Sequence, residues 1–239
     1  MLNSSNMPFP SSTLSNIEAT NAFFRKVYNW MAAGLILTAI TAHVVASSDA
    51  MVNALYSSRG LLMALVIVEV GLVFFLSMAI NKISAATASM LFIAYSLLNG
   101  VTLSSVLLVY TSESVFAAFL TTAGMFGAMS VYGLYTKRDL TSMGGFLMMG
   151  LWGLIIAMVV NMFLGSSMLE LVISGIGVLV FMGLTAYDTQ YLRELGGQVD
   201  VNGLDDTPRK MVIIGSLKLY LDFVNLFIYL LRFLGNRRD

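Results

Sequence analysis

Long apolar runs dominate this sequence and constrain its fold more than any other feature. Each run is close to the roughly 20 residues that a helix needs to cross a hydrocarbon core about 30 Å thick. Inside lipid only helices and closed barrels satisfy the backbone, and barrel strands would be short segments of alternating polarity. The sequence therefore predicts an all-α integral membrane protein, a seven-transmembrane-helix bundle with spans at residues 28–45, 61–80, 86–110, 115–135, 146–164, 168–187 and 211–234.

The composition supports this fold class and excludes several kinds of partner. Of the 239 residues, 58% are hydrophobic and 11% are charged, whereas an ordinary soluble domain is about 25% charged. Thirteen basic and thirteen acidic residues leave no net charge, so no nucleic-acid partner is expected, and membrane lipids are the expected surroundings. Without cysteine, and with a single histidine, the chain has no basis for a disulfide, a thiolate site or a zinc site, and no cofactor is expected.

The N-terminal segment differs from the rest of the chain. It is rich in Ser and Asn and lacks the basic start and short apolar core of a cleaved signal peptide. We expect a flexible polar cytoplasmic tail at residues 1–27 and one seven-helix transmembrane domain at residues 28–239.

The distribution of lysine and arginine predicts the orientation in the membrane. Cytoplasmic loops carry the excess of these residues, so the N-terminus is expected in the cytoplasm. An odd number of spans then places the basic C-terminal tail outside, and a re-entrant last segment would remove that conflict. The basic residues on the N-terminal side would be Arg25, Lys26, Lys82, Lys137, Arg138, Arg193, Arg209 and Lys210.

Close contact between helices is predicted at one small-residue pattern. Gly124 and Ala128 are four residues apart, the spacing that lets two helix backbones approach each other in a membrane. We interpret this pattern as a packing feature.

Four charged residues lie at membrane depth: Glu69, Asp188, Lys218 and Asp222. Each costs about 2.5 to 3.5 kcal/mol at a helix centre on insertion scales, so each is a functional candidate. Lys218 and Asp222 are four residues apart on one helical face and could instead neutralise each other. Glu69 has no partner by spacing, and it is either a bundle-facing carboxyl or part of a polar path.

Asp188 and Asp222 are predicted at similar depths. With a rise of 1.5 Å per residue they lie about 10 Å and about 16 Å from the same end of adjacent antiparallel helices, so their carboxyls could meet. At about 4 Å and an effective dielectric near 20, two like charges repel by about 4 kcal/mol. Such a pair would share one proton near neutral pH, and the titration would belong to the pair.

The motifs around these aspartates carry a family resemblance. The segments GLTAYDTQYL (183–192) and LKLYLDFVNLFIYLLRFLGNRR (217–238), together with 124–151, closely resemble the bacterial inner-membrane branch of the transmembrane Bax inhibitor motif family. The resemblance implies seven helices with the last one central, and a pH-sensitive calcium leak in which Asp188 and Asp222 are the paired aspartates. In some members an arginine at the end of the second helix holds this pair shut. Here Ile80 or Asn81 stands at that position, and Lys82 or Lys218 could substitute.

The chemistry is compatible with a calcium path. Calcium takes six to eight oxygen ligands, and the two carboxylates with Asn225, Asn99 or backbone carbonyls would bind it weakly enough to let it pass. We therefore expect a non-enzymatic calcium leak channel that responds to protons.

Two other classes of function stay open. Aspartates on neighbouring membrane helices also resemble intramembrane aspartyl proteases, but the glycine-x-glycine-aspartate motif of those enzymes is absent before Asp222. A non-conducting regulator that binds other membrane proteins would use the N-terminal tail or the loop at 196–210 as contact surfaces.

Overall fold

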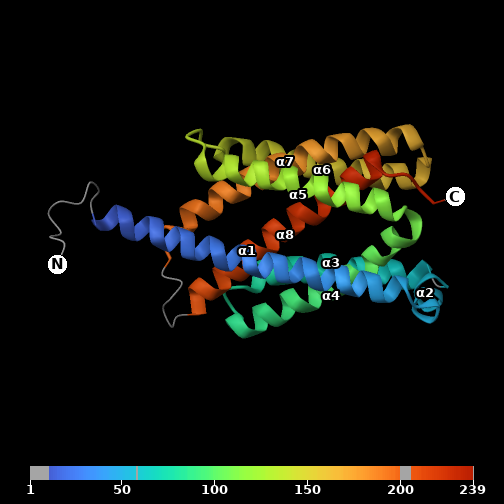
Figure 1. The fold of residues 1–239 in the computed structure, drawn as a ribbon, viewed down its shortest axis with the longest axis horizontal. Coiled ribbons are helices and arrows are strands. Elements are labelled where there is room, and N and C mark those ends of the chain that lie inside the picture. Colours follow the sequence, from blue (N-terminus) through green and yellow to red (C-terminus); the bar gives the residue numbers. More distant parts are fainter. Residues whose placement is uncertain (1–10, 58, 200–205, 239) are drawn as a thin grey trace.

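The described residues of the computed structural model, 11–57, 59–199 and 206–238, form eight α-helices (Figure 1). Seven of them are long and apolar enough to cross a membrane, which confirms the predicted spans. The short helix α2 was not predicted. The helices are α1 (Ser11–Ala46), α2 (Asp49–Tyr56), α3 (Arg59–Ala79), α4 (Ala85–Val109), α5 (Ser112–Tyr135), α6 (Thr141–Leu164), α7 (Ser167–Gly196) and α8 (Asp206–Leu234).

Hydroxyl side chains mark where several helices begin. The hydroxyl of Ser84 accepts a hydrogen bond from Thr87 N at the start of α4, and Thr111 and Ser166 do the same at the starts of α5 and α7. These caps satisfy backbone donors that a helix leaves open in its first turn. At the end of α6, Gly165 adopts φ 61°, a left-handed conformation that glycine reaches without strain.

Helix α1 begins earlier than the predicted first span. It starts at Ser11, and its side chains Phe23 and Val27 are fully buried against the bundle. Residues 1–10 of the expected tail, and residues 200–205 of the loop considered as a contact surface, lie outside the described residues. The division into tail and domain stays a prediction.

The long helices pack in two groups (Figure 1). Helix α1 packs on α4, which also carries α3, while α5 and α6 both pack on α7. Helix α8 packs against members of both groups, namely α1, α4, α5 and α7, and has the largest buried share of the seven spans. Helices α3 and α6 have the smallest, and residues such as Ile67 and Phe163 expose their side chains as expected beside lipid.

The expected close contact at Gly124 is wrong. Gly124 and Ala128 both lie on the exposed face of α5, and nothing approaches within 4 Å of the position that a Cβ would take on Gly124. The close approach of α5 is at Gly133, where a Cβ would lie 2.4 Å from the carbonyl oxygen of Ala186 in α7. Spacing alone did not distinguish the lipid-facing pair from the glycine that contacts the neighbouring helix.

The C-terminal segment folds back onto the turn between α4 and α5. Arg238 N donates to Val109 O at 2.8 Å, and Thr111 N donates to Asn236 O at 3.2 Å. Arg237 also forms an ion pair with Glu170 at the start of α7, at 3.1 Å. A hydrogen bond with Tyr110 and the nearby Glu170 carboxylate raise the pKa of the Arg237 guanidinium. The segment therefore connects α8 to three other helices.

Candidate functional site

Asp188 and Lys218 form an ion pair between α7 and α8, in the half of the bundle where α7 ends and α8 begins. We call that end of the bundle the near end, and the opposite end the far end. Nζ of Lys218 lies 2.9 Å from Oδ1 of Asp188. The Asp188 side chain is 10% exposed and that of Lys218 is 39% exposed, and the ammonium also lies 5.3 Å from the centre of the Tyr191 ring.

Lys218 thus bonds to the neighbouring helix and not along its own. The ion pair between Lys218 and Asp222 that their spacing allowed is not formed among the described residues. The sequence placed the lysine on the correct face of α8 but could not show which aspartate it contacts.

Asp222 lies beside this ion pair and is almost completely buried, with 4% of its surface exposed. Its Oδ2 atom has no hydrogen-bond partner among the described residues. Its charged neighbours are Asp188 and Lys218. A buried polar atom without a partner costs about 1 to 3 kcal/mol, and more when it is charged. We call these three residues the dyad cluster.

The dyad cluster contains two carboxylates, and the described residues place no third acidic side chain with them. No group of three or more His, Cys, Asp or Glu side chains suited to a metal ion occurs in the part of the chain that the structure describes. Two carboxylates can contribute only some of the six to eight oxygen ligands that calcium takes. The arrangement can hold a proton or attract a cation in passing.

A second polar group, the Glu69 network, lies around a carboxylate of α3. Thr102 donates its hydroxyl hydrogen to Glu69 Oε1 at 2.5 Å, and the Asn99 side-chain amide donates to Oε2 at 3.4 Å. Asn99 in turn accepts from the Tyr220 hydroxyl at 3.0 Å, and that hydroxyl lies 2.6 Å from Oγ1 of Thr38. The network connects α3, α4, α8 and α1 through neutral hydrogen-bonding groups.

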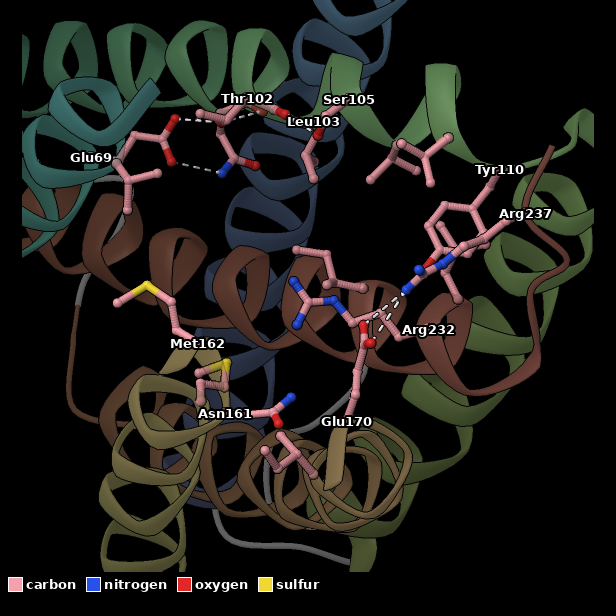
Figure 2. A pocket seen from close by; sticks show the side chains of 18 residues that line it. Glu69, Thr102, Leu103, Ser105, Tyr110, Asn161, Met162, Glu170, Arg232 and Arg237 are labelled. Carbon is pink, nitrogen blue, oxygen red and sulfur yellow. Dashed lines mark hydrogen bonds and ion pairs between the residues drawn. The ribbon is translucent and has the colours of Figure 1, made fainter. Parts of the chain in front are cut away.

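The Glu69 network borders a cavity of about 680 Å³ that reaches the far end of the bundle (Figure 2). Arg232 of α8 points into this cavity, between Glu69 and Glu170 (Figure 2). Among the described residues neither carboxylate forms an ion pair with Arg232. Two acidic and two basic side chains line the space: Glu69, Glu170, Arg232 and Arg237.

Helix α8 connects the dyad cluster with this cavity. Lys218, Asp222, Asn225 and Arg232 follow one another at spacings of four, three and seven residues, so they share one helical face. Asn225 is half-buried and donates to Leu221 O at 2.8 Å. The face spans about 21 Å at 1.5 Å per residue, a large part of a hydrocarbon core.

The structure separates some residues that the sequence analysis grouped. Asn99 belongs to the Glu69 network, where it bonds to Glu69 and Tyr220, and it forms no hydrogen bond with the dyad cluster among the described residues. Lys82 is exposed in the turn between α3 and α4, and it forms no ion pair with an aspartate among the described residues. Of the two lysines considered beside the aspartates, Lys218 is the one that contacts an aspartate.

Several residues that contribute to these sites were not predicted from the sequence. Tyr220 is fully buried and its ring meets the rings of Phe92 and Tyr95 edge-on, but a tyrosine in an apolar helix gives no signal of a polar network. Glu170 and Arg232 stand at helix ends, where charged residues are ordinary. The sequence offered one signal within α4: Asn99 and Thr102 are three residues apart and therefore share a helical face, but nothing in the spacing connects them to Glu69.

Comparisons with known proteins cover almost the whole chain. The family model described as "Inhibitor of apoptosis-promoting Bax1" matches residues 20–239. The inner membrane protein YbhL of Escherichia coli K12 is 49% identical over 231 residues, covering 97% of this chain and 98% of the relative. A protein of Borreliella burgdorferi is 48% identical over 92% of this chain and 94% of its own length, and the protein YrjE of Lactococcus lactis is 37% identical over 91% and 92%.

Proposed function

Because the chain belongs to the Bax inhibitor family of membrane proteins, we propose that it is a pH-sensitive calcium leak channel in which Asp188 and Asp222 control opening. The observation that supports this proposal most strongly is Asp222 Oδ2, a buried atom with no described partner beside the ion pair of Asp188 and Lys218. A charged cluster of this kind inside an apolar bundle is costly, and functional sites are where such costs are found.

The proposed mechanism uses protonation of the dyad cluster. With both carboxylates ionised, Lys218 neutralises one of the two charges and the other stays buried. Uptake of a proton by either carboxyl removes the repulsion between the two aspartates, and protonation of Asp188 also weakens its bond to Lys218. The packing of α7 against α8 would then change with pH, and with it the open fraction.

The proposed ion path follows α8 as the central helix of the bundle. On the far side a cation would reach the cavity bordered by Glu69 and Glu170, and it would pass Asn225 before the dyad cluster. These oxygens are few and spread along the helix, so binding at each position would be weak and calcium could leave as easily as it arrives.

The decisive experiment is calcium flux into proteoliposomes that contain only this protein, with sodium and potassium measured in parallel. Calcium flux that exceeds the flux of both monovalent ions supports the proposal. Absence of any cation flux in vesicles with correctly inserted protein contradicts it and favours a non-conducting protein.

The role of the dyad cluster is tested by Asp188→Asn and Asp222→Asn. Each change removes one of the two interacting carboxyls, so the pH dependence of flux near neutrality should vanish in both variants. The double variant should behave like either single variant. If either single variant keeps the pH profile of the unmodified protein, the two carboxyls do not form the sensor.

The proposed orientation places the N-terminus in the cytoplasm of a bacterial cell and the chain in its inner membrane, as the name of the Escherichia coli relative suggests. A reporter joined by a flexible linker after Asp239 should then report an external position. A cytoplasmic reporter would mean that α8 does not cross, and the path along α8 would be wrong.

A second candidate is a non-conducting regulator of other membrane proteins. The description of the matching family names an inhibitor of an apoptosis-promoting protein, and this favours a binding role. The two functions separate in the flux experiment, because a regulator alone would leave the vesicles impermeable. Peptide cleavage by the purified protein would instead support the protease alternative.

A further inference from the structure

We propose that a cavity at the near end, between α1, α4 and α8, binds the phosphate of an anionic phospholipid headgroup. The cavity measures about 400 Å³, within the range of small-molecule sites, and is separate from the dyad cluster and from the Glu69 network. It takes Lys26 and Trp30 from α1, Ser84 and Ser89 from the start of α4, and Arg209 from the start of α8.

The charges around this cavity favour an anion. Among the described residues that line it, Lys26 and Arg209 are basic and Asp206 is acidic, so positive charge exceeds negative charge by one. Asp206 Oδ2 accepts a hydrogen bond from Ala85 N at 3.4 Å, which directs this carboxylate toward the backbone at the start of α4. The guanidinium of Arg209 and the ammonium of Lys26 are charged donors of the kind that a phosphate group accepts.

The remaining walls fit a lipid and not a free anion. The floor is formed by the buried residues Ala85, Val212 and Ile213, so the cavity is apolar on the side of the bundle core. Trp30 lies four residues after Lys26 on the same face of α1, and its ring meets Phe92 edge-on at 6.0 Å. Tryptophan beside basic residues at the end of a span is typical of the headgroup level of a bilayer.

Trp30 provides a direct probe, because the chain has only two tryptophans, Trp30 and Trp152. In a Trp152→Phe background, reconstituted in nanodiscs, lipids brominated in the upper acyl chain quench Trp30 when they lie next to it. We expect brominated phosphatidylglycerol, diluted into unlabelled phosphatidylcholine, to quench Trp30 at several-fold lower mole fraction than brominated phosphatidylcholine.

Matched variants distinguish specific binding in the cavity from general attraction of anionic lipids to surface charge. Lys26→Gln with Arg209→Gln should reduce the preference for phosphatidylglycerol about fivefold or more. Arg25→Gln with Lys210→Gln removes the same charge at neighbouring positions that do not line the cavity, and should leave most of the preference intact. An equal loss in both double variants would show attraction by surface charge only and overturn the proposal.

Two further results would also overturn it. The first is equal quenching by the two brominated lipids in the parent protein. The second is relief of the phosphatidylglycerol quenching by millimolar inorganic phosphate, relative to chloride of equal ionic strength, which would identify a free-phosphate site. If the Lys26 and Arg209 variant unfolds, the quenching comparison in the parent protein and the phosphate competition still decide the question.

Discussion

The dyad cluster and the Glu69 network both place a carboxylate inside the bundle, but they stabilise it in different ways. Asp188 is held by a partly exposed lysine on the next helix, and its neighbour Asp222 keeps an oxygen without a described partner. Glu69 is held by the neutral groups of Asn99 and Thr102. The balance of charges in the dyad cluster changes when one proton binds. The neutral hydrogen bonds of the Glu69 network instead fix the position of the Glu69 side chain.

This difference leads to different expectations for the two regions. The dyad cluster should respond to pH and to the loss of any of its charges. The Glu69 network should respond to the loss of a hydrogen bond with lower stability and little change in pH dependence.

Lys218→Met should have the largest effect. It leaves Asp188 without its cation at a nearly buried position, and we expect the free energy of unfolding to fall by about 2 to 3 kcal/mol, less than for a fully buried pair because Lys218 is partly exposed. Loss of the positive charge favours the protonated form, so the pH at half-maximal calcium flux should move upward.

The control for this variant is Lys82→Met, which removes a lysine from the exposed turn before α4. We expect nearly unchanged stability and an unchanged pH profile. A larger shift from Lys82→Met than from Lys218→Met would show that the turn after α3 controls closure, as the family resemblance suggests for an arginine at that place.

Tyr220→Phe should have an intermediate effect. It removes the hydroxyl that lies between Asn99 and Thr38 while keeping the ring packed, and buried partners that lose a hydrogen bond cost about 1 to 2 kcal/mol. Thermal unfolding in detergent would measure the loss, and Tyr95→Phe is the matched aromatic control. If Tyr220→Phe moves the pH at half-maximal flux as far as Lys218→Met does, the two polar regions are not separate.

Asp139→Asn should have the smallest effect. Asp139 is an exposed carboxylate outside the membrane, so this variant is a reference for the buried carboxylates of the two regions. Asp139 accepts a hydrogen bond from Thr141 N at 2.8 Å at the start of α6, and the hydrogen bonds with Thr141 lower the pKa of its carboxyl. A lowered pKa means that the stabilisation is present at neutral pH and is lost as the pH falls through the acidic range. The unfolding temperatures of the unmodified protein and the variant should differ slightly at pH 7, and the difference should shrink as the pH falls below the ordinary pKa of an aspartate. A difference that stays constant throughout the acidic range would contradict this.

The sequence predicted the helices well because the length of an apolar run is set directly by the thickness of a bilayer. It predicted α8 as a span in spite of Lys218 and Asp222, and the same two residues led to the dyad cluster. The partner of Lys218 could not be predicted from the sequence, because the long side chain of a lysine can extend along its own helix or toward the neighbouring helix. Only the packing of α7 against α8 determines whether Lys218 pairs with Asp222 or with Asp188.

The Glu69 network was less accessible to sequence reasoning for a related reason. Its members come from four helices, and Tyr220 is 121 residues away from Asn99 along the chain. No periodicity connects residues on different helices. The error at Gly124 has the same origin, since the face of a helix that meets lipid and the face that meets protein are both apolar in a membrane.

The tail that folds back onto the turn between α4 and α5 also has a mechanical consequence. Helix α8 is tied at its far end by Arg238 and Asn236, and at its near end by the bond from Ala85 to Asp206. Sliding of α8 along its axis would break hydrogen bonds at both ends. These bonds therefore restrict translation of the helix along its axis. Helix α3 is held less firmly: it packs mainly on α4 and is joined to α1 through the short helix α2, so we expect any widening of the far cavity to involve α3 and not α8.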